Sequence, residues 1–155
     1  MKPEELPRIT ASHLVKSIDL NHHGTLFAGR MAEWLVEVGF ITARAALACE
    51  PGDLVCVRLH GMDFRESINK GETLVLEGRA AHVGRSSITI YVEAYALRPA
   101  TTRLTSTDGF VTLVHVSEGR AIPHGLTITP PEEPQARELW DHVVEGRQRQ
   151  RQKSG

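Results

Sequence analysis

The chain has 155 residues, of which 41% are hydrophobic, and its formal net charge is −1. This length suits a single domain with one core. The near-neutral charge excludes a global basic field that would draw the protein to nucleic acid or to a membrane surface. No apolar run approaches the ~18 residues that span a bilayer, and the first ten residues (MKPEELPRIT) do not resemble a signal sequence, so we expect a cytoplasmic protein.

The predicted elements begin with a β-branched strand over residues 9–18, followed by a helix over residues 26–48 that contains no proline. The apolar residues of this helix cover far more than the ~100° stripe of a surface helix, which predicts that it is covered on several sides. Its polar residues Arg30, Glu33 and Glu37 recur at three- and four-residue steps and therefore share one flank. One small sheet cannot cover the rest, which predicts a homo-oligomer, a dimer at least and a tetramer or hexamer beyond it.

The chain then changes period, and four β-rich runs follow at 54–59, 73–83, 87–97 and 110–116. Short turns join them, which favours an antiparallel meander covered on one face by the helix. A terminal helix is expected from residue 132 to about residue 149. We expect one domain over residues 1–150 and a basic, disordered tail over 151–155.

The cysteines and the isolated histidines do not form a metal-binding pattern. Cys49 and Cys56 lack the short paired spacing of a zinc site or a redox motif, and we expect both to be buried free thiols. His82, His115 and His124 have no partner at ligand spacing, which indicates core or surface residues. We therefore expect no metal and no cofactor.

Several spaced motifs resemble one known family. Residues 19–29 (DLNHHGTLFAG), followed by Met31 and Trp34, resemble the D-x-N-x-x-G-T-L-F-G-G…W-I-D-E segment of the acyl-CoA thioesterases. Residues 62–65, 70–74 and 83–88 (MDFR, KGETL and VGRSSI) resemble the D-F, G-D-x-L and V-G-R-S-S-M segments of that family. The resemblance spans residues 8–150 and implies an α+β hotdog fold, in which an antiparallel sheet wraps one long helix, with a C-terminal helix added.

Hydrolysis of a thioester needs donors for the developing oxyanion and a group that activates water. The helix start offers free backbone N–H groups, and Gly24 and Gly29 let a carbonyl approach them; alternatively, these glycines serve a tight turn and close packing. The resemblance implies that Asn21 orients the water or the carbonyl, whereas the alternative is a cap of the turn. His22 and His23 are candidate donors or bases, or else exposed or interfacial residues.

The resemblance places the catalytic carboxylate of the family at Val36, which is neither a base nor a nucleophile. Glu37 follows directly and matches the second acid of the family, and Glu33 lies one helical turn earlier on the same flank. Glu37 is our first candidate for the working carboxylate, and Glu33 is the second. The alternative is that both are solvated acids or ion pairs with Arg30 and Arg44.

The phosphates of coenzyme A require a second group of donors. The resemblance and the residue types point to a hairpin mouth made of Gly84, Arg85, Ser86 and Ser87. Other candidates for substrate binding are Phe27 at the helix start and Arg65, Lys70 and Arg103 on neighbouring loops; the alternative is that these are ordinary exposed residues.

The sequence thus predicts hydrolysis of acyl-CoA thioesters to free acid and coenzyme A. Because valine stands at position 36, a hotdog protein that binds acyl-CoA without hydrolysing it is the alternative. A third hypothesis is an assembly scaffold whose basic tail contacts an anionic partner.

Overall fold

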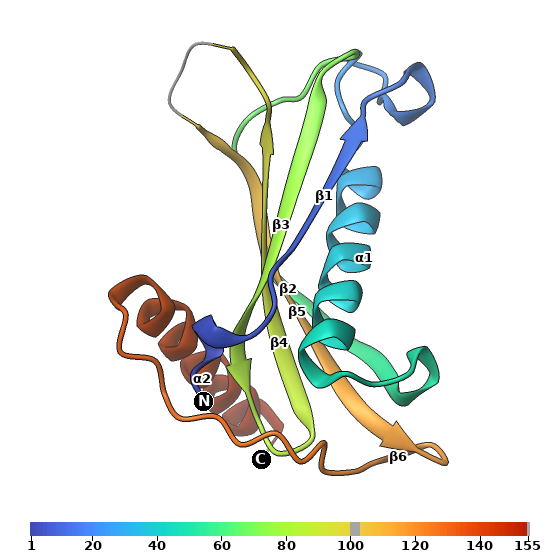
Figure 1. Ribbon diagram of the computed structural model, residues 1–155. Helices are drawn as coiled ribbons and strands as arrows, with labels where there is room; N and C mark the ends of the chain where they lie inside the picture. Colours follow the sequence, from blue (N-terminus) through green and yellow to red (C-terminus); the bar gives the residue numbers. More distant parts are fainter. Residues whose placement is uncertain (100–102, 155) are drawn as a thin grey trace.

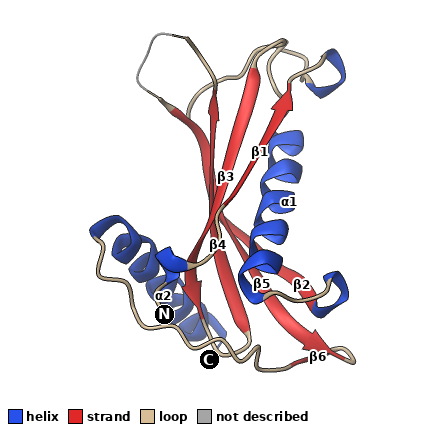
Figure 2. Cartoon of the chain, in the orientation of Figure 1, coloured by secondary structure: helices blue, strands red, loops and turns tan. Residues whose placement is uncertain are grey.

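The computed structural model describes residues 1–99 and 103–154, which form a curved antiparallel sheet with one helix on each face (Figure 1). In chain order the elements are β1 (Ile9–Leu14), α1 (Ala28–Leu47), β2 (Leu54–Phe64), β3 (Thr73–Val83), β4 (Ser87–Ala96), β5 (Thr105–Ser117), β6 (Arg120–Ala121) and α2 (Pro134–Ser154). Single turns of 3-10 helix lie at Pro3–Glu5, Ser17–Asp19 and Pro51–Asp53. The long strands separate α1 from α2, so the two helices do not share a face of the sheet (Figure 2).

The strands lie in the order β1-β3-β4-β5-β2, and each neighbouring pair is antiparallel. The predicted meander is therefore confirmed for β3, β4 and β5 but is wrong for β2, which pairs with β5 at the far edge. A turn does form at residues 69–72, where the Glu72 N–H donates to the Asn69 carbonyl at 3.2 Å. It ends the loop between β2 and β3, and these two strands do not pair as a hairpin. β1 occupies the second edge of β3, so the free edge of β5 is the position left for β2.

Small residues let α1 approach the sheet closely. A Cβ on Gly39 would meet Val111 of β5 at 2.7 Å, and a Cβ on Gly78 of β3 would meet the hydroxyl of Thr42. The sheet face beneath α1 is fully buried and aliphatic: Leu74, Leu76, Ile88, Ile90, Val92, Val111 and Leu113. Burying each such side chain stabilises the fold by about 1.5–3 kcal/mol. This helix on a curved sheet is the hotdog arrangement that the resemblance implies.

Several boundaries and burial predictions need correction. β1 ends at Leu14 because a 3-10 turn at Ser17–Asp19 begins shortly after it. α2 continues to Ser154, beyond the predicted end, because the alternating arginines and glutamines are good helix formers; residue 155 lies outside the described residues. Both cysteines are free as predicted, but Cys56 is exposed because β2 is an edge strand, and Cys49 is half-buried.

Among the described residues, no helix is both long and apolar enough to cross a bilayer.

Candidate active site

The turn before α1 holds the start of the helix in place. Asp19 is buried, and its carboxylate accepts a hydrogen bond from the Lys16 N–H at 2.8 Å and lies 3.2 Å from the Nε of Arg30. Its backbone carbonyl accepts the N–H of Phe27 at 2.8 Å. Asp19 was missed as a site residue although it begins the matched motif, and the structure assigns it the positioning of the first helical turn.

Asn21 caps the turn that leads into the helix. Its Oδ1 accepts the N–H groups of His23 at 2.8 Å and of Thr25 at 3.2 Å, and its Nδ2 donates to the Thr25 hydroxyl at 3.1 Å. An amide nitrogen carries two hydrogens, so one remains for a ligand. Gly24 has φ +80°, a conformation that glycine adopts without strain. His22 and His23 are exposed, and their ring centroids lie 3.9 Å apart.

Two free backbone donors lie at the start of α1. Among the described residues, the N–H groups of Ala28 and Gly29 have no acceptor, whereas those of Arg30 and Met31 bond to the Phe27 carbonyl. A Cβ on Gly29 would lie 2.5 Å from the Phe27 ring, which therefore covers this glycine. These two donors and the positive end of the helix dipole form a site suited to an anion or an oxyanion.

A cavity of about 270 Å³ opens beside these donors. Asn21, Thr25 and Ala28 line one wall, and residues 64–68 with Ser106 and Thr107 line the other. Thr107 is buried, and its hydroxyl has no hydrogen-bond partner among the described residues. Thr107 was not predicted as a site residue because it precedes the strand expected at 110–116 and was therefore expected in a loop; the available signal was the run of hydroxyl residues directly before that apolar strand.

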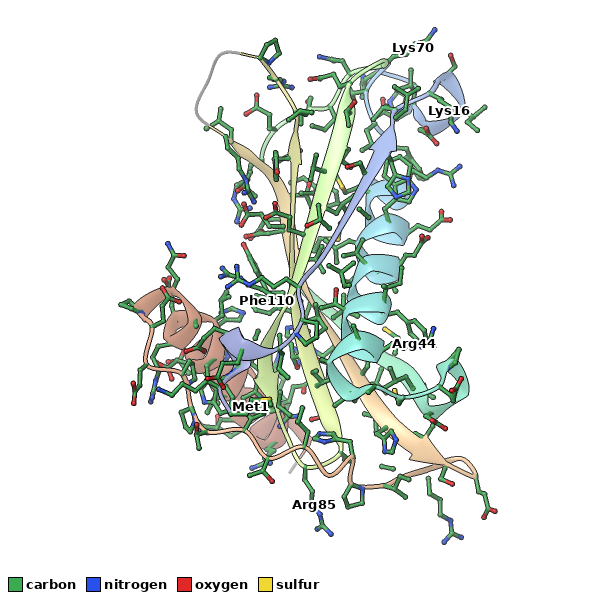
Figure 3. The ribbon with its side chains drawn as sticks, viewed as in Figure 1. Met1, Lys16, Arg44, Lys70, Arg85 and Phe110 are labelled. Atoms are coloured by element: carbon green, nitrogen blue, oxygen red, sulfur yellow. The ribbon has the colours of Figure 1, made fainter. Side chains whose placement is uncertain are left out.

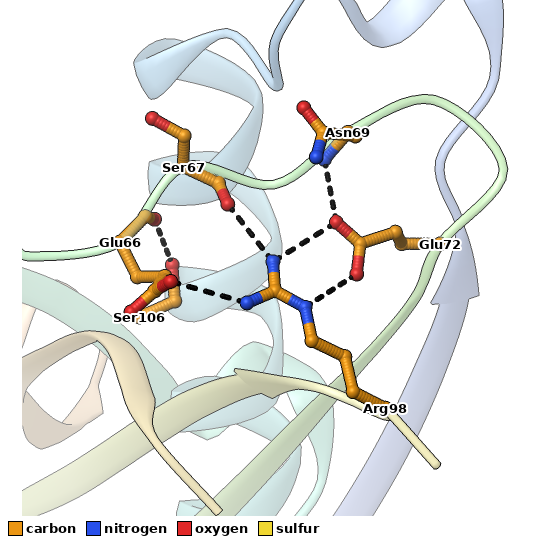
Figure 4. Close-up of polar contacts among 6 residues, drawn as sticks. All are labelled: Glu66, Ser67, Asn69, Glu72, Arg98 and Ser106. Carbon is orange, nitrogen blue, oxygen red and sulfur yellow. Dashed lines mark hydrogen bonds and ion pairs between the residues drawn. The ribbon is translucent and has the colours of Figure 1, made fainter.

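A cluster of ionic bonds anchors the loop that forms this second wall (Figure 4). Arg98, just after β4, contacts both carboxylate oxygens of Glu72 at 2.7 and 3.0 Å and one of Glu66 at 3.1 Å. In the same loop, the carbonyl of Ile68 accepts a hydrogen bond from the Leu26 N–H at 2.8 Å. The cluster therefore fixes the distance between the loop and the start of α1.

The predicted basic residues on loops separate into two groups. Arg65 lines the cavity, and its guanidinium pairs with Asp108 on the sheet at 2.6 Å and with Asp63 at 3.4 Å. Arg103 instead bridges Glu77 at 2.8 Å and Glu93 at 2.7 Å, outside the cavity. Each of these two guanidinium groups is thus held by two carboxylates, and only that of Arg65 lies at the cavity.

The hairpin between β3 and β4 lies far from the cavity in this chain. Arg85 marks one end of the molecule, while Lys70 and Lys16 mark the opposite end, near the turn before α1 (Figure 3). Ser86 accepts a backbone N–H from β5, and Arg85 is exposed at the tip. One chain therefore does not bring the predicted phosphate cradle together with Asn21.

The carboxylate candidates lie along α1. Gly39 faces β5 at Val111, and Trp34 stacks on His13 of β1. With about 100° per residue, Val36 lies on the flank toward β5 and β2, whereas Glu37 points away from the sheet.

Glu33 and Glu37 are both exposed, in agreement with a position of Glu37 on the side of α1 that points away from the sheet. Glu33 pairs with Arg30 at 3.1 Å. Glu37 has no hydrogen-bond or ion-pair partner in the part of the chain that the structure describes. Arg44, the other expected partner, instead donates to the Cys49 carbonyl at 3.2 Å.

Comparison with known proteins identifies the family. The model of the thioesterase superfamily matches residues 23–102, which include the end of the turn before α1, α1 itself and the β3–β4 hairpin. The chain belongs to the thioesterase superfamily.

Relatives agree with this membership. The uncharacterized acyl-CoA thioester hydrolase YkhA of Bacillus subtilis is 26% identical over 128 residues, 81% of this chain and 73% of the relative. An uncharacterized acyl-CoA thioester hydrolase of Haemophilus influenzae is 32% identical over 112 residues, 68% of this chain and 71% of that protein. The crystal structure of an apo hexameric acyl-CoA thioesterase is similar to this superfamily member with a TM-score of 0.84 and 27% identity, covering 99% of this chain and 96% of that one.

Proposed function

We propose that the protein hydrolyses acyl-CoA thioesters. The observation that carries this proposal is the pair of free N–H groups at Ala28 and Gly29, beside a cavity that also holds Asn21 and Thr107. A thioester carbonyl bonded to these N–H groups would be polarised, and its oxyanion would be stabilised by the helix dipole. Relatives named as acyl-CoA thioester hydrolases support coenzyme A as the carrier.

The carboxylate has to come from a second chain. At about 1.5 Å per residue, position 36 lies about 10 Å along the helix from Gly29, and Glu37 lies about 12 Å from it. A carboxylate at either position cannot reach a carbonyl held at the start of its own helix. A neighbouring α1 that runs in the opposite direction would bring its own third turn to that carbonyl.

The exposed edge strand indicates where the second chain binds. Val55, Val57, Leu59 and Phe64 of β2 are between 39% and 56% exposed, and the backbone of β2 has neighbours on one side only. Covering such an edge with a second copy of β2 would pair its free backbone groups and bury these apolar side chains. A two-fold axis through this edge would also make α1 of the partner run in the opposite direction to α1 of this chain.

This inversion would bring the two predicted parts of the site to the same end of the assembly. The partner's β3–β4 hairpin would lie at the end of the assembly where this chain holds Asn21. We therefore propose a dimer as the functional unit. A tetramer or hexamer is the expected assembly, as in the hexameric thioesterase of similar fold, and light scattering after gel filtration would test it.

The single most informative experiment measures thiol release from a panel of acyl-CoA thioesters. We expect turnover by the wild type and a loss of about 10²–10⁴-fold in Glu37→Gln, the range for removing a general base. Glu33→Gln is the matched control, because it removes a carboxylate one turn away that is already paired with Arg30.

The half-buried Val36 favours a second function, binding of acyl-CoA without hydrolysis. In that case the wild type would bind acyl-CoA without turnover, and Val36→Asp would introduce activity. Such a result would overturn the enzymatic proposal and leave a binding protein.

A further inference from the structure

A second cavity lies on the face of the sheet that α1 does not cover. It measures about 260 Å³ and lies between α2 and strands β2, β4 and β5. Its polar lining includes Arg58 and His60 of β2, Ser87 of β4, Thr112 of β5 and Arg147 of α2. No carboxylate lines it.

Arg147 is a half-buried cation without a counter-ion. Its guanidinium donates to the Ser87 hydroxyl, and among the described residues no carboxylate lies within ion-pair distance of it. Burial and the positive charge of Arg151 lower its pKa. Keeping a guanidinium partly desolvated beside other cations is unfavourable unless an anion joins it.

The titratable neighbours of Arg147 are also basic. Burial, followed by the charges of Arg58 and His142, lowers the pKa of His60 to about 4. Burial and the charge of Arg147 lower the pKa of His82 to about 4. Beyond the larger effect of burial, the charges of Arg58 and His142 oppose protonation of His60, and the charge of Arg147 opposes protonation of His82. An anion in the cavity would offset these charges.

The β3–β4 hairpin is shaped around this guanidinium. A Cβ on Gly84 would lie 3.1 Å from the Nη1 of Arg147 and 2.6 Å from the Ser87 hydroxyl. Glycine at this position therefore keeps room for Arg147 against the hairpin backbone. The motif that pointed to Arg85 as a phosphate ligand can therefore be interpreted in a second way. Its residues Gly84 and Ser87 contact Arg147, whereas Arg85 itself is exposed at the tip of the hairpin.

The donors in the cavity suit a phosphate group. A guanidinium has five N–H donors in a planar fork that matches two phosphate oxygens, and Arg147 uses one of them on Ser87. Thr112 adds a hydroxyl that is already oriented by Thr89 at 2.8 Å and by His60 at 3.2 Å. We propose that Arg147 and Arg58, with Ser87 and Thr112, bind a phosphomonoester or pyrophosphate group in this cavity.

Two ligands carry such a phosphate group: coenzyme A, at its nucleotide end, and free inorganic phosphates. Assignment to coenzyme A rests on the proposed function, whereas the site itself does not. Binding of coenzyme A, dephospho-coenzyme A and inorganic pyrophosphate is measured by calorimetry on wild type, Arg147→Gln, Arg147→Lys and Arg58→Gln. Arg149→Gln is the control, since it removes an exposed arginine from the same helix.

Loss of one charge-assisted hydrogen bond weakens binding about 10- to 100-fold, so we expect that loss for Arg147→Gln, a smaller one for Arg147→Lys and none for Arg149→Gln. Loss of pyrophosphate binding with unchanged coenzyme A binding would support the site and assign it to free phosphates. Equal affinities for every probe in wild type, Arg147→Gln and Arg58→Gln would overturn the proposal. So would dissociation of the oligomer by Arg147→Gln, because a carboxylate of a second copy would then be the counter-ion.

Hydrolysis of an acyl N-acetylcysteamine thioester, which lacks the nucleotide, separates this proposal from the preceding one. Equal rates for wild type and Arg147→Gln on this substrate, with weaker coenzyme A binding by the variant, support the phosphate site. No hydrolysis of any thioester by the wild type would defeat the proposed function, and the binding measurements would still decide the phosphate site.

Discussion

Replacing Thr107 with valine is expected to change stability and activity in opposite directions. Thr107 is 1% exposed, and its hydroxyl has no hydrogen-bond partner among the described residues. A buried polar group without a partner costs about 1–3 kcal/mol relative to a bonded one. Valine keeps the shape and removes this group, so we expect the free energy of unfolding to rise by about 1 kcal/mol.

Thr107 also lines the cavity beside Asn21 and Ala28. A neutral hydrogen bond from it to the substrate is worth about 0.5–1.5 kcal/mol. Its loss in Thr107→Val should therefore lower kcat/KM by about 2- to 10-fold.

Urea unfolding followed by tryptophan fluorescence measures the stability, and thiol release from acyl-CoA measures the activity. Thr107→Ser is the control, because it keeps the hydroxyl and removes a methyl group; we expect about 1 kcal/mol less stability and retained activity. A less stable Thr107→Val would show that the hydroxyl has a partner in the folded protein. A more stable variant with unchanged kcat/KM would instead remove Thr107 from the substrate site.

Three further predictions concern the packing of α1, a buried histidine and the loop beside the first cavity. Gly39→Ala should lower the free energy of unfolding by about 1–3 kcal/mol through overpacking, whereas Gly52→Ala, where a Cβ would meet nothing, should not; equal urea midpoints would contradict this. His82 has a folded pKa of about 4, below the ordinary 6.5, so the unfolded state binds more protons between these values. Stability should therefore fall as pH drops through that window, and His82→Gln should flatten the dependence in urea titrations at pH 7 and pH 5. Arg98→Ala should accelerate hydrogen exchange in the loop that it anchors, with only a small loss of global stability because the pairs are partly exposed; unchanged exchange would show that the loop is held by other contacts.

Periodicity predicted the elements whose environment is set by local pattern. In the run at 87–97 every second residue from Ile88 is apolar, which predicts a buried face, and Ile88, Ile90 and Val92 of β4 are all fully buried. The bounds of β3 were predicted correctly at Thr73–Val83, because turn residues flank it on both sides. The partner of β2 was not predictable in this way, since a turn signal does not show whether the next strand pairs locally or across the sheet.

The residues of the site also differ in how far the sequence could predict them. The motif at residues 19–29 located the helix start, its glycines and Asn21, all of which are close in sequence. Thr107 and Arg98 come from segments distant in sequence, and their roles depend on which strands become neighbours. The sequence shows that these residues carry a hydroxyl and a guanidinium, but it does not show where the two side chains point.

The sequence by itself determined the fold class, the family and the start of α1, because apolar periodicity and a contiguous motif are properties of neighbouring residues. Only the tertiary structure decided that Arg85 lies at the far end of the chain from Asn21, that Glu37 points away from the sheet, and that Arg147 packs against Gly84. These results depend on helix rotation and strand order, which are set by packing across the whole core.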